Sequence, residues 1–205
     1  MDACREKLQQ GLLALGLPAD ENRLEALLSF VRLISKWNKA YNLTAVREPL
    51  DMVSLHILDS LAILPHLRPP RIADIGTGAG LPGIPLAVCM PDCQFTLVDS
   101  NSKKTRFVQQ AILELQLKNV EVVHSRVEQL NPEQRYSTVI TRAFASMPDI
   151  IRLTAHLVAD DGLLLAMKGQ RPDGELAELQ MAYSVVPIIT PGIDAERCLI
   201  LVEKP

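Results

Sequence analysis

Three glycines at alternate positions follow a short apolar run and precede a helical pattern in residues 72–83. Glycine has no Cβ atom, so the backbone at Gly76, Gly78 and Gly80 could approach a ligand closely, and the first N–H groups of the next helix would supply donors. A strand, a glycine-rich loop and a helix in this order are typical of α/β proteins with a parallel sheet. The stretch therefore predicts an α/β fold with a nucleotide-type pocket. The alternative is a tight turn that binds nothing.

Short apolar runs alternate with amphipathic stretches along the rest of the chain. This pattern predicts strands separated by helices in a doubly wound parallel sheet. The last two runs differ, because only a short loop containing Pro191 and Gly192 joins them, and they predict an antiparallel hairpin that closes the sheet. The predicted strands are residues 71–75, 94–98, 120–124, 138–141, 163–167, 183–190 and 197–202.

The N-terminal third of the chain is predicted to be helical. Apolar residues recur at three- and four-residue spacing over residues 21–39, the stripe of a half-buried helix. A second helical stretch covers residues 52–64, and the sequence Arg-Pro-Pro at 68–70 ends helix formation. We therefore divide the chain into an N-terminal helical cap, residues 1–70, and a main domain, residues 71–205.

Composition places the chain among ordinary globular proteins. Of its 205 residues, 48% are hydrophobic and 22% are charged, which excludes the disordered, collagen-like and disulfide-scaffold classes. No apolar run approaches the roughly 18 residues that a membrane helix needs, and the N-terminus has no basic segment followed by an apolar one. The protein is therefore expected to be cytoplasmic and to make no membrane contact.

Cysteines and charges narrow the function classes further. The four cysteines are scattered, with no second pair or nearby histidine to complete a zinc site, so we expect reduced thiols and no metal. The histidines have no ligand-like spacing, and no role is assigned to them. A formal net charge of −3 means that nucleic acid would have to be bound by a local basic patch. Aromatic residues make up only 4% of the chain, which argues against a platform that stacks single-stranded bases.

Two cofactors fit the glycine loop. Gly78, Gly80 and Gly83 form the G-x-G-x-x-G pattern of dinucleotide-binding proteins, with Asp99 at the end of the next strand. Asp74, two residues before the first glycine, favours S-adenosylmethionine instead, because a carboxylate repels a pyrophosphate and attracts the ammonium and sulfonium groups of the methionine end. The prolines that flank Gly83 and the C-terminal hairpin favour the same cofactor.

The candidate site residues have alternative interpretations. Asp99 would accept hydrogen bonds from ribose hydroxyls, or else cap the next helix. Asp74 would face the methionine end, or else be a solvated or capping acid. Val127 and Glu128 follow the third strand, where a sheet of this kind places residues beside an adenine ring. Arg142 ends the fourth strand, at the edge where ligands bind such sheets, or else is a plain surface arginine.

Further cations lie near this predicted edge or on the helical cap. Lys168 ends the fifth strand, where it adds a second cation to the edge or is simply solvated. One cluster follows Asp99, and another recurs at helical spacing within residues 21–39; either could contact phosphates or form the solvated face of a helix. The clusters are Lys103, Lys104 and Arg106, and Arg32, Lys36 and Lys39.

Five segments are similar to one known family. They are residues 36–44 (KWNKAYNLT), 56–60 (HILDS), the glycine motif through Pro85, 142–145 (RAFA) and 168–169 (KG). Over nearly its whole length the chain resembles the small-subunit (16S) ribosomal RNA guanine-N7 methyltransferases of the methyltransferase G family, formerly called glucose-inhibited division protein B. The resemblance implies a class I S-adenosylmethionine-dependent methyltransferase, Rossmann-like with an N-terminal helical cap, that methylates one guanine of small-subunit ribosomal RNA.

The resemblance also implies cofactor contacts at Gly76, Leu81, Val127, Glu128 and Arg142. N7 of guanine carries a lone pair and no proton, so the transfer needs positioning and no general base, and no catalytic acid or base is predicted. The partner would be small-subunit ribosomal RNA or the assembling small subunit, and the protein is expected to be a monomer. A small-molecule methyltransferase, a nicotinamide-dependent oxidoreductase and a non-catalytic RNA-binding assembly factor remain as alternatives.

Overall fold

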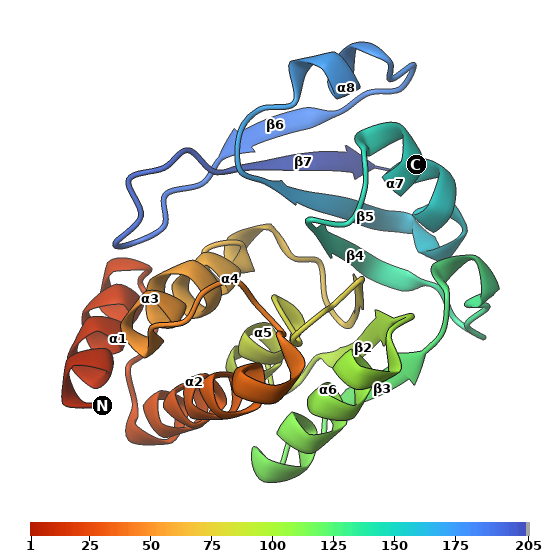
Figure 1. The fold of residues 1–205 in the computed structure, drawn as a ribbon. Coiled ribbons are helices and arrows are strands. Elements are labelled where there is room, and N and C mark those ends of the chain that lie inside the picture. Colours follow the sequence, from red (N-terminus) through yellow and green to blue (C-terminus); the bar gives the residue numbers. More distant parts are fainter. Residues whose placement is uncertain (204–205) are drawn as a thin grey trace.

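A computed structural model describes residues 1–203 and contains one mixed sheet with helices on both faces (Figure 1). The seven strands have the order β3-β2-β1-β4-β5-β7-β6, in which β7 is antiparallel to both of its neighbours and the other pairs are parallel. The order reverses between β1 and β4, which is where such sheets bind ligands. The strands are β1 (Arg71–Ile75), β2 (Gln94–Asp99), β3 (Val120–His124), β4 (Tyr136–Arg142), β5 (Val158–Lys168), β6 (Ser184–Pro187) and β7 (Cys198–Glu203).

The helices of the cap precede the sheet in the chain, and the others connect its strands. A π-helical segment, Val53–Leu58, joins α3 to α4, so residues 49–61 form one continuous helix. The long helix α2 begins after Asp20, whose side chain accepts a hydrogen bond from the backbone N–H of Arg23 at 3.0 Å. The α-helices are α1 (Asp2–Ala14), α2 (Glu21–Tyr41), α3 (Pro49–Met52), α4 (Asp59–Leu61), α5 (Gly83–Cys89), α6 (Ser102–Glu114), α7 (Met147–Thr154) and α8 (Asp173–Ala177).

The predicted fold class and elements are confirmed, with differences at their ends. The predicted stretch 52–64 begins earlier, because Pro49 favours the first turn of a helix, and ends at Leu61. The strand predicted at 183–190 ends at Pro187. Beyond Ile188 the chain leaves the sheet and packs against the cap, where the Thr190 hydroxyl donates to Asp59 at 3.3 Å.

Two hydrophobic clusters fill the two faces of the sheet. Along β5, Leu163 and Leu165 belong to one cluster and Leu164 to the other, as the alternation of side chains along a strand requires. The larger cluster joins the cap, α5 and α6 to one face, and the smaller one includes α7 on the opposite face. Because the larger cluster extends from Leu8 in α1 to Phe95 in β2, the hydrophobic core is continuous across the predicted boundary at residue 70.

Other features bear on the function classes. No helix within residues 1–203 is long and apolar enough to cross a membrane. Among the same residues, no group of three or more His, Cys, Asp or Glu side chains is arranged to hold a metal ion. All four cysteines are free, and burial raises the pKa of the Cys89 thiol to about 11.

Candidate functional site

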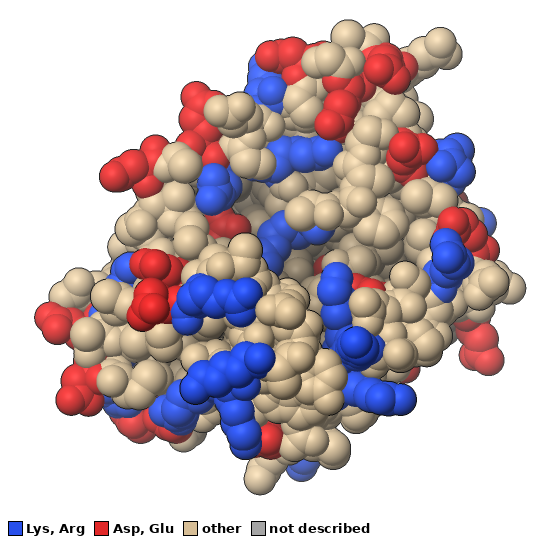
Figure 2. Space-filling view, viewed as in Figure 1, with Lys and Arg blue, Asp and Glu red and all other residues tan. Residues whose placement is uncertain are grey.

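Three adjoining cavities follow the edge of the sheet at which β1, β2, β4 and β5 end. We call them the β2 cavity, about 230 Å³ beside the end of β2, the loop cavity, about 180 Å³ at the glycine loop, and the large cavity, about 480 Å³ between the ends of β4 and β5 and the cap. Gly76 lines both the β2 and the loop cavity, and His56 and Arg142 line both the loop and the large cavity. Figure 2 shows this face hollowed near its centre, with Lys and Arg side chains along the walls.

The glycine loop presents open backbone to the loop cavity. Gly76, Gly78 and Gly80 have φ angles of 73°, 61° and 75°, in the left-handed region that favours glycine. A Cβ atom on Gly78 would meet no atom closer than 3.9 Å, and Leu81 lines the same cavity. Gly80 faces away, because a Cβ atom there would lie 2.7 Å from Ile84, and it is not among the residues that line these three cavities. The structure therefore brings Gly76, Gly78 and Leu81 together and places Gly80 in the packing against α5.

Asp74 lies beneath the glycine loop. Its side chain is fully buried, and one carboxylate oxygen accepts from the Thr77 hydroxyl at 2.6 Å and from the Gly83 N–H at 2.9 Å. Burial raises the pKa of Asp74 to about 6. The interpretation of Asp74 as a solvated acid is wrong, whereas the capping interpretation agrees with its bond to the first residue of α5. Asp74 lines none of the three cavities, so the interpretation that it faces the methionine end is not supported. It instead connects both ends of the loop to the end of β1.

Asp99 ends β2 and connects it to the same loop. Its carboxylate accepts from the Gly78 N–H at 2.9 Å and from the Asn101 N–H at 2.8 Å, and its side chain is 8% exposed. The alternative that Asp99 caps α6 is wrong, because Asn101 is the N-cap and accepts from the Lys103 N–H. The ammonium of Lys104 lies 3.9 Å from Asp99, and both residues line the β2 cavity. The arrangement offers a ligand a fixed carboxylate beside a cation.

Val127 and Glu128 complete the β2 cavity. They form a short 3₁₀ turn after β3, in which Val127 is buried and Glu128 is exposed. Both line the β2 cavity together with Gly76 and Asp99. Four of the predicted site residues, separated by up to 52 positions in the sequence, thus surround one cavity.

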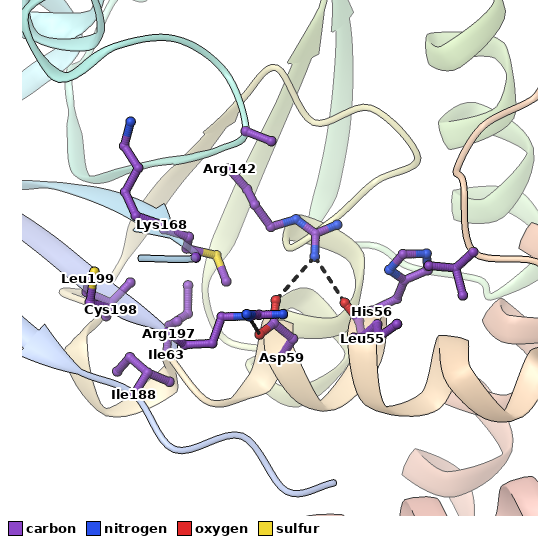
Figure 3. A pocket seen from close by; sticks show the side chains of 14 residues that line it. Leu55, His56, Asp59, Ile63, Arg142, Lys168, Ile188, Arg197, Cys198 and Leu199 are labelled. Carbon is purple, nitrogen blue, oxygen red and sulfur yellow. Dashed lines mark hydrogen bonds and ion pairs between the residues drawn. The ribbon is translucent and has the colours of Figure 1, made fainter. Parts of the chain in front are cut away.

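Arg142 lies at the junction of the loop and large cavities (Figure 3). Its guanidinium lies 3.5 Å from the Asp59 carboxylate and donates to the Leu55 carbonyl at 3.5 Å. Burial lowers the pKa of Arg142, and the neighbouring Asp59 and Asp74 carboxylates oppose that effect. The Arg142 side chain is 22% exposed, so the interpretation as a plain surface arginine is wrong. Sequence reasoning missed Asp59, which also accepts from Arg197 Nε at 3.1 Å.

His56 is a second residue that sequence reasoning missed. Its Nε2 atom lies 2.9 Å from the Thr44 hydroxyl, and its Nδ1 atom is buried with no hydrogen-bond partner in the described part of the chain. Burial, and then the charge of Arg142, lowers the pKa of His56 to about 4, so the ring is neutral at physiological pH. Leu55, His56 and Asp59 have the three- and four-residue spacing of one helical face, which was the available signal.

The remaining predicted cations differ in their partners and in their exposure. Lys168 lines the large cavity and donates to Glu175 at 2.8 Å and to the Ala145 carbonyl at 3.1 Å, so it is not a solvated lysine. Arg32 pairs with Glu25 along α2. Figure 2 shows Lys and Arg side chains gathered below the hollow, over α2 and α6. The exposed members of the two predicted clusters are Lys103, Arg106, Arg32, Lys36 and Lys39.

The fold is similar to that of solved methyltransferases. The chain resembles TrmN from Thermus thermophilus with a TM-score of 0.57 and 14% identity, over 81% of this chain and 53% of that one. It resembles the ribosomal protein L11 methylase from Lactobacillus delbrueckii subsp. bulgaricus with a TM-score of 0.55 and 15% identity, over 72% and 77% of the two chains. At these identities the likeness establishes the class I methyltransferase fold alone.

Sequence relatives are much more similar. Residues 23–194 match the family described as GidB, rRNA small subunit methyltransferase G. The ribosomal RNA small subunit methyltransferase G of Methylobacillus flagellatus is 49% identical over 96% of each chain. The protein of the same name from Legionella pneumophila is 50% identical over 98% of this chain and 95% of that protein. The chain therefore belongs to the rRNA small subunit methyltransferase G family.

Proposed function

We propose that the protein transfers a methyl group from S-adenosylmethionine to N7 of a guanine in small-subunit ribosomal RNA, with the guanine in the large cavity. The observation that carries this proposal is the junction between the cavities, where His56 and Arg142 line both the loop cavity and the large cavity. A cofactor held over the glycine loop and a base held in the large cavity would meet at this junction.

The residues around the β2 and loop cavities fit S-adenosylmethionine. The absence of a Cβ atom at Gly78 leaves backbone that a ligand can contact, whereas its absence at Gly76 makes room for the Phe144 ring. The Asp99 carboxylate can accept from ribose hydroxyls. Val127 offers an apolar contact for adenine beside the polar Glu128. The cofactor supplies a methyl group on a sulfonium. Arg142, Leu81 and Thr77 would enclose its methionine end in the loop cavity.

The large cavity is suited to guanine more than to adenine. Arg142 and Arg197 have N–H groups beyond those bound to Asp59, and guanidinium N–H groups pair well with the O6 carbonyl of guanine. Adenine presents an amino group at that position, which would face these donors unfavourably. Both oxygens of Asp59 face guanidiniums, and an acceptor atom that carries no proton, such as N7, needs no base at this site.

The remaining parts of the proposal concern the partner. N7 faces the deep, narrow groove of a regular RNA helix, so the target guanine would lie in a loop or in an assembling small subunit, in the cytoplasm. The exposed cations on α2 and α6 would contact RNA phosphates. We propose that residues 1–70 act as a cap on the methyltransferase domain, residues 71–205, because the cap supplies Thr44 and His56 to the cavities, and that the protein acts as a monomer.

The proposal is tested by mapping modified nucleosides. Small-subunit ribosomal RNA from cells without the protein is incubated with purified protein and S-adenosylmethionine, as free RNA and as assembled subunits, and is analysed by mass spectrometry. We expect one new N7-methylguanosine. A methyl group on another atom or base would overturn the assignment of N7, and methylation of a small molecule alone would support the alternative acceptor class.

A further inference from the structure

We propose that Asp59 is a positioning residue that holds Arg142 and Arg197 in one arrangement for methyl transfer. The proposal rests on the proposed function, because it concerns the cavity assigned above to the guanine. Arg142 reaches the cavity from the end of β4, and Arg197 precedes β7, so the fold brings two guanidiniums to one carboxylate from distant segments (Figure 3).

The two oxygens of the Asp59 carboxylate have different partners. Oδ2 lies 3.5 Å from Nη1 of Arg142, which faces both cavities. Oδ1 accepts from Nε of Arg197 at 3.1 Å and from the Thr190 hydroxyl at 3.3 Å. The Asp59 side chain is only 8% exposed. One buried carboxylate therefore connects the arginine that lines the loop cavity to the segment between β6 and β7 that lines the large cavity.

The helix that bears Asp59 is shaped for this contact. The π-helical segment Val53–Leu58 directly precedes it, and π turns inside helices are frequent at functional sites. Leu55, His56 and Asp59 all line the large cavity, and the Leu55 carbonyl provides a second acceptor for Arg142. The wide turn thus directs a carbonyl and a carboxylate to the same guanidinium.

Charge explains what Asp59 would do there. Arg197 lies close enough to disfavour the charged form of Arg142. Without the carboxylate two like charges would face each other, and Arg197, which lies just outside β7, would move away more readily than Arg142, which the Leu55 carbonyl still holds. Neither Asp59 nor Arg197 lines the β2 or the loop cavity. Loss of Asp59 should therefore impair use of the RNA and spare the cofactor.

The test compares Asp59→Asn, which keeps the shape and loses the charge, with Asp51→Asn, an exposed aspartate on the same continuous helix. For Asp59→Asn we expect kcat/KM for the ribosomal RNA to fall about tenfold or more, while the Kd for S-adenosylmethionine in calorimetry changes by less than about threefold. Asp51→Asn should match the parent in both. Equal losses in cofactor affinity and in kcat/KM, or no loss in either, would overturn the proposal.

A double-mutant cycle tests whether Asp59 acts through Arg197. If Asp59 acts through Arg197, Asp59→Asn combined with Arg197→Gln should be no worse in kcat/KM than Arg197→Gln alone, within about twofold. Multiplicative losses would show that Asp59 acts independently and would overturn the proposal. A parent protein that forms no N7-methylguanosine would instead contradict the proposed function, which separates the two failures.

Discussion

At the scale of single residues, a substitution of Gly78 tests the proposed cofactor site most directly. Its φ of 61° lies in the left-handed region, and an added Cβ atom would meet no atom closer than 3.9 Å. Gly78→Val should fold with a cost of about 1–2 kcal/mol from backbone strain, while its side chain fills the loop cavity and abolishes binding of S-adenosylmethionine in calorimetry.

Gly16 provides a matched control for the backbone strain of a valine at a positive φ. Gly16 has a φ of 70° and open space around its Cβ position, but it follows α1 away from the cavities. Gly16→Val should lose a similar free energy of unfolding and bind the cofactor like the parent. Normal cofactor affinity in a folded Gly78→Val protein would remove Gly78 from the site.

Asp74 is a second single residue that can be tested, because its ionisation should make the free energy of unfolding depend on pH. Burial raises its pKa from 3.8 to about 6, so between these values the folded protein binds a proton that the unfolded chain does not. The free energy of unfolding therefore falls as the pH rises through this window, by about 3 kcal/mol in total. Asp74→Asn cannot ionise, and its amide oxygen can still accept from Thr77 and Gly83.

We therefore expect the stability of Asp74→Asn relative to the parent to increase from about pH 4 to about pH 7, as measured by urea denaturation at both values. The buried Oδ1 atom, which has no partner within residues 1–203, is where the amide nitrogen can be placed without displacing an existing bond. A stability difference that stays constant with pH would show that Asp74 is ionised over the whole range.

At the scale of elements, the connection from α2 to α3 forms a wall of the site. Asn38, which is 2% exposed in α2, donates to the carbonyls of Thr44 and Val46 at 3.0 and 3.2 Å and accepts from the Thr44 N–H at 2.9 Å. Leu43 and Thr44 line the loop cavity, and Val46 lines the large one. One buried amide thus fixes a loop that faces both cavities.

Asn38→Ala should lower the free energy of unfolding by about 2–4 kcal/mol, because it leaves three partly buried backbone groups without their side-chain partner. It should also speed amide hydrogen exchange in residues 42–47 more than in the sheet, since the loop opens locally. Asn22→Ala, an exposed position on the same helix, should change stability by less than about 0.5 kcal/mol. Uniform exchange across the chain would contradict a local role for Asn38.

The order of elements could be predicted from the sequence, but the π turn could not. The glycine loop and the apolar runs predict the strands, since alternation and loop chemistry are local properties. Apolar side chains recur at helical spacing over residues 52–64, and this spacing does not distinguish an α turn from a π turn. The π segment packs against α1 and α2, and a local sequence pattern does not show contacts with such distant segments.

At the scale of the whole molecule, the site residues also divide into those that the sequence could predict and those that it could not. Gly76, Asp99 and Arg142 end strands or begin loops, so the edge of a parallel sheet brings them together as predicted. Asp59 and Arg197 are 138 positions apart and meet only because the loop after β6 packs on the cap. No periodicity in the sequence encodes a contact between a cap helix and the C-terminal hairpin.

Because the net charge is −3, RNA affinity should depend on local groups of cations. The structure shows which of these cations can be substituted without also changing the proposed cofactor site. Lys104 lies 3.9 Å from Asp99 and lines both the β2 and the loop cavity, the proposed cofactor site, so its substitution is expected to alter cofactor binding as well. Lys103 and Arg106 are exposed on α6, so substituting them should change RNA binding without changing cofactor binding. Lys118 and Arg135 precede β3 and β4, at the opposite edge of the sheet, and serve as a matched pair of controls.

Lys103→Glu combined with Arg106→Glu is expected to weaken binding to small-subunit RNA at physiological salt. Each lost phosphate contact should reduce the slope of log K against log salt by about 0.7 to 0.9, because fewer counterions are released on binding. Lys118→Glu combined with Arg135→Glu changes the net charge equally and should preserve the slope, and both variants should bind S-adenosylmethionine like the parent. If the two pairs lower RNA affinity equally, then the net charge governs binding, and the cations on α6 have no special role. If neither pair does, the RNA docks on another surface, of which the exposed Lys36 and Lys39 on α2 are the next to test.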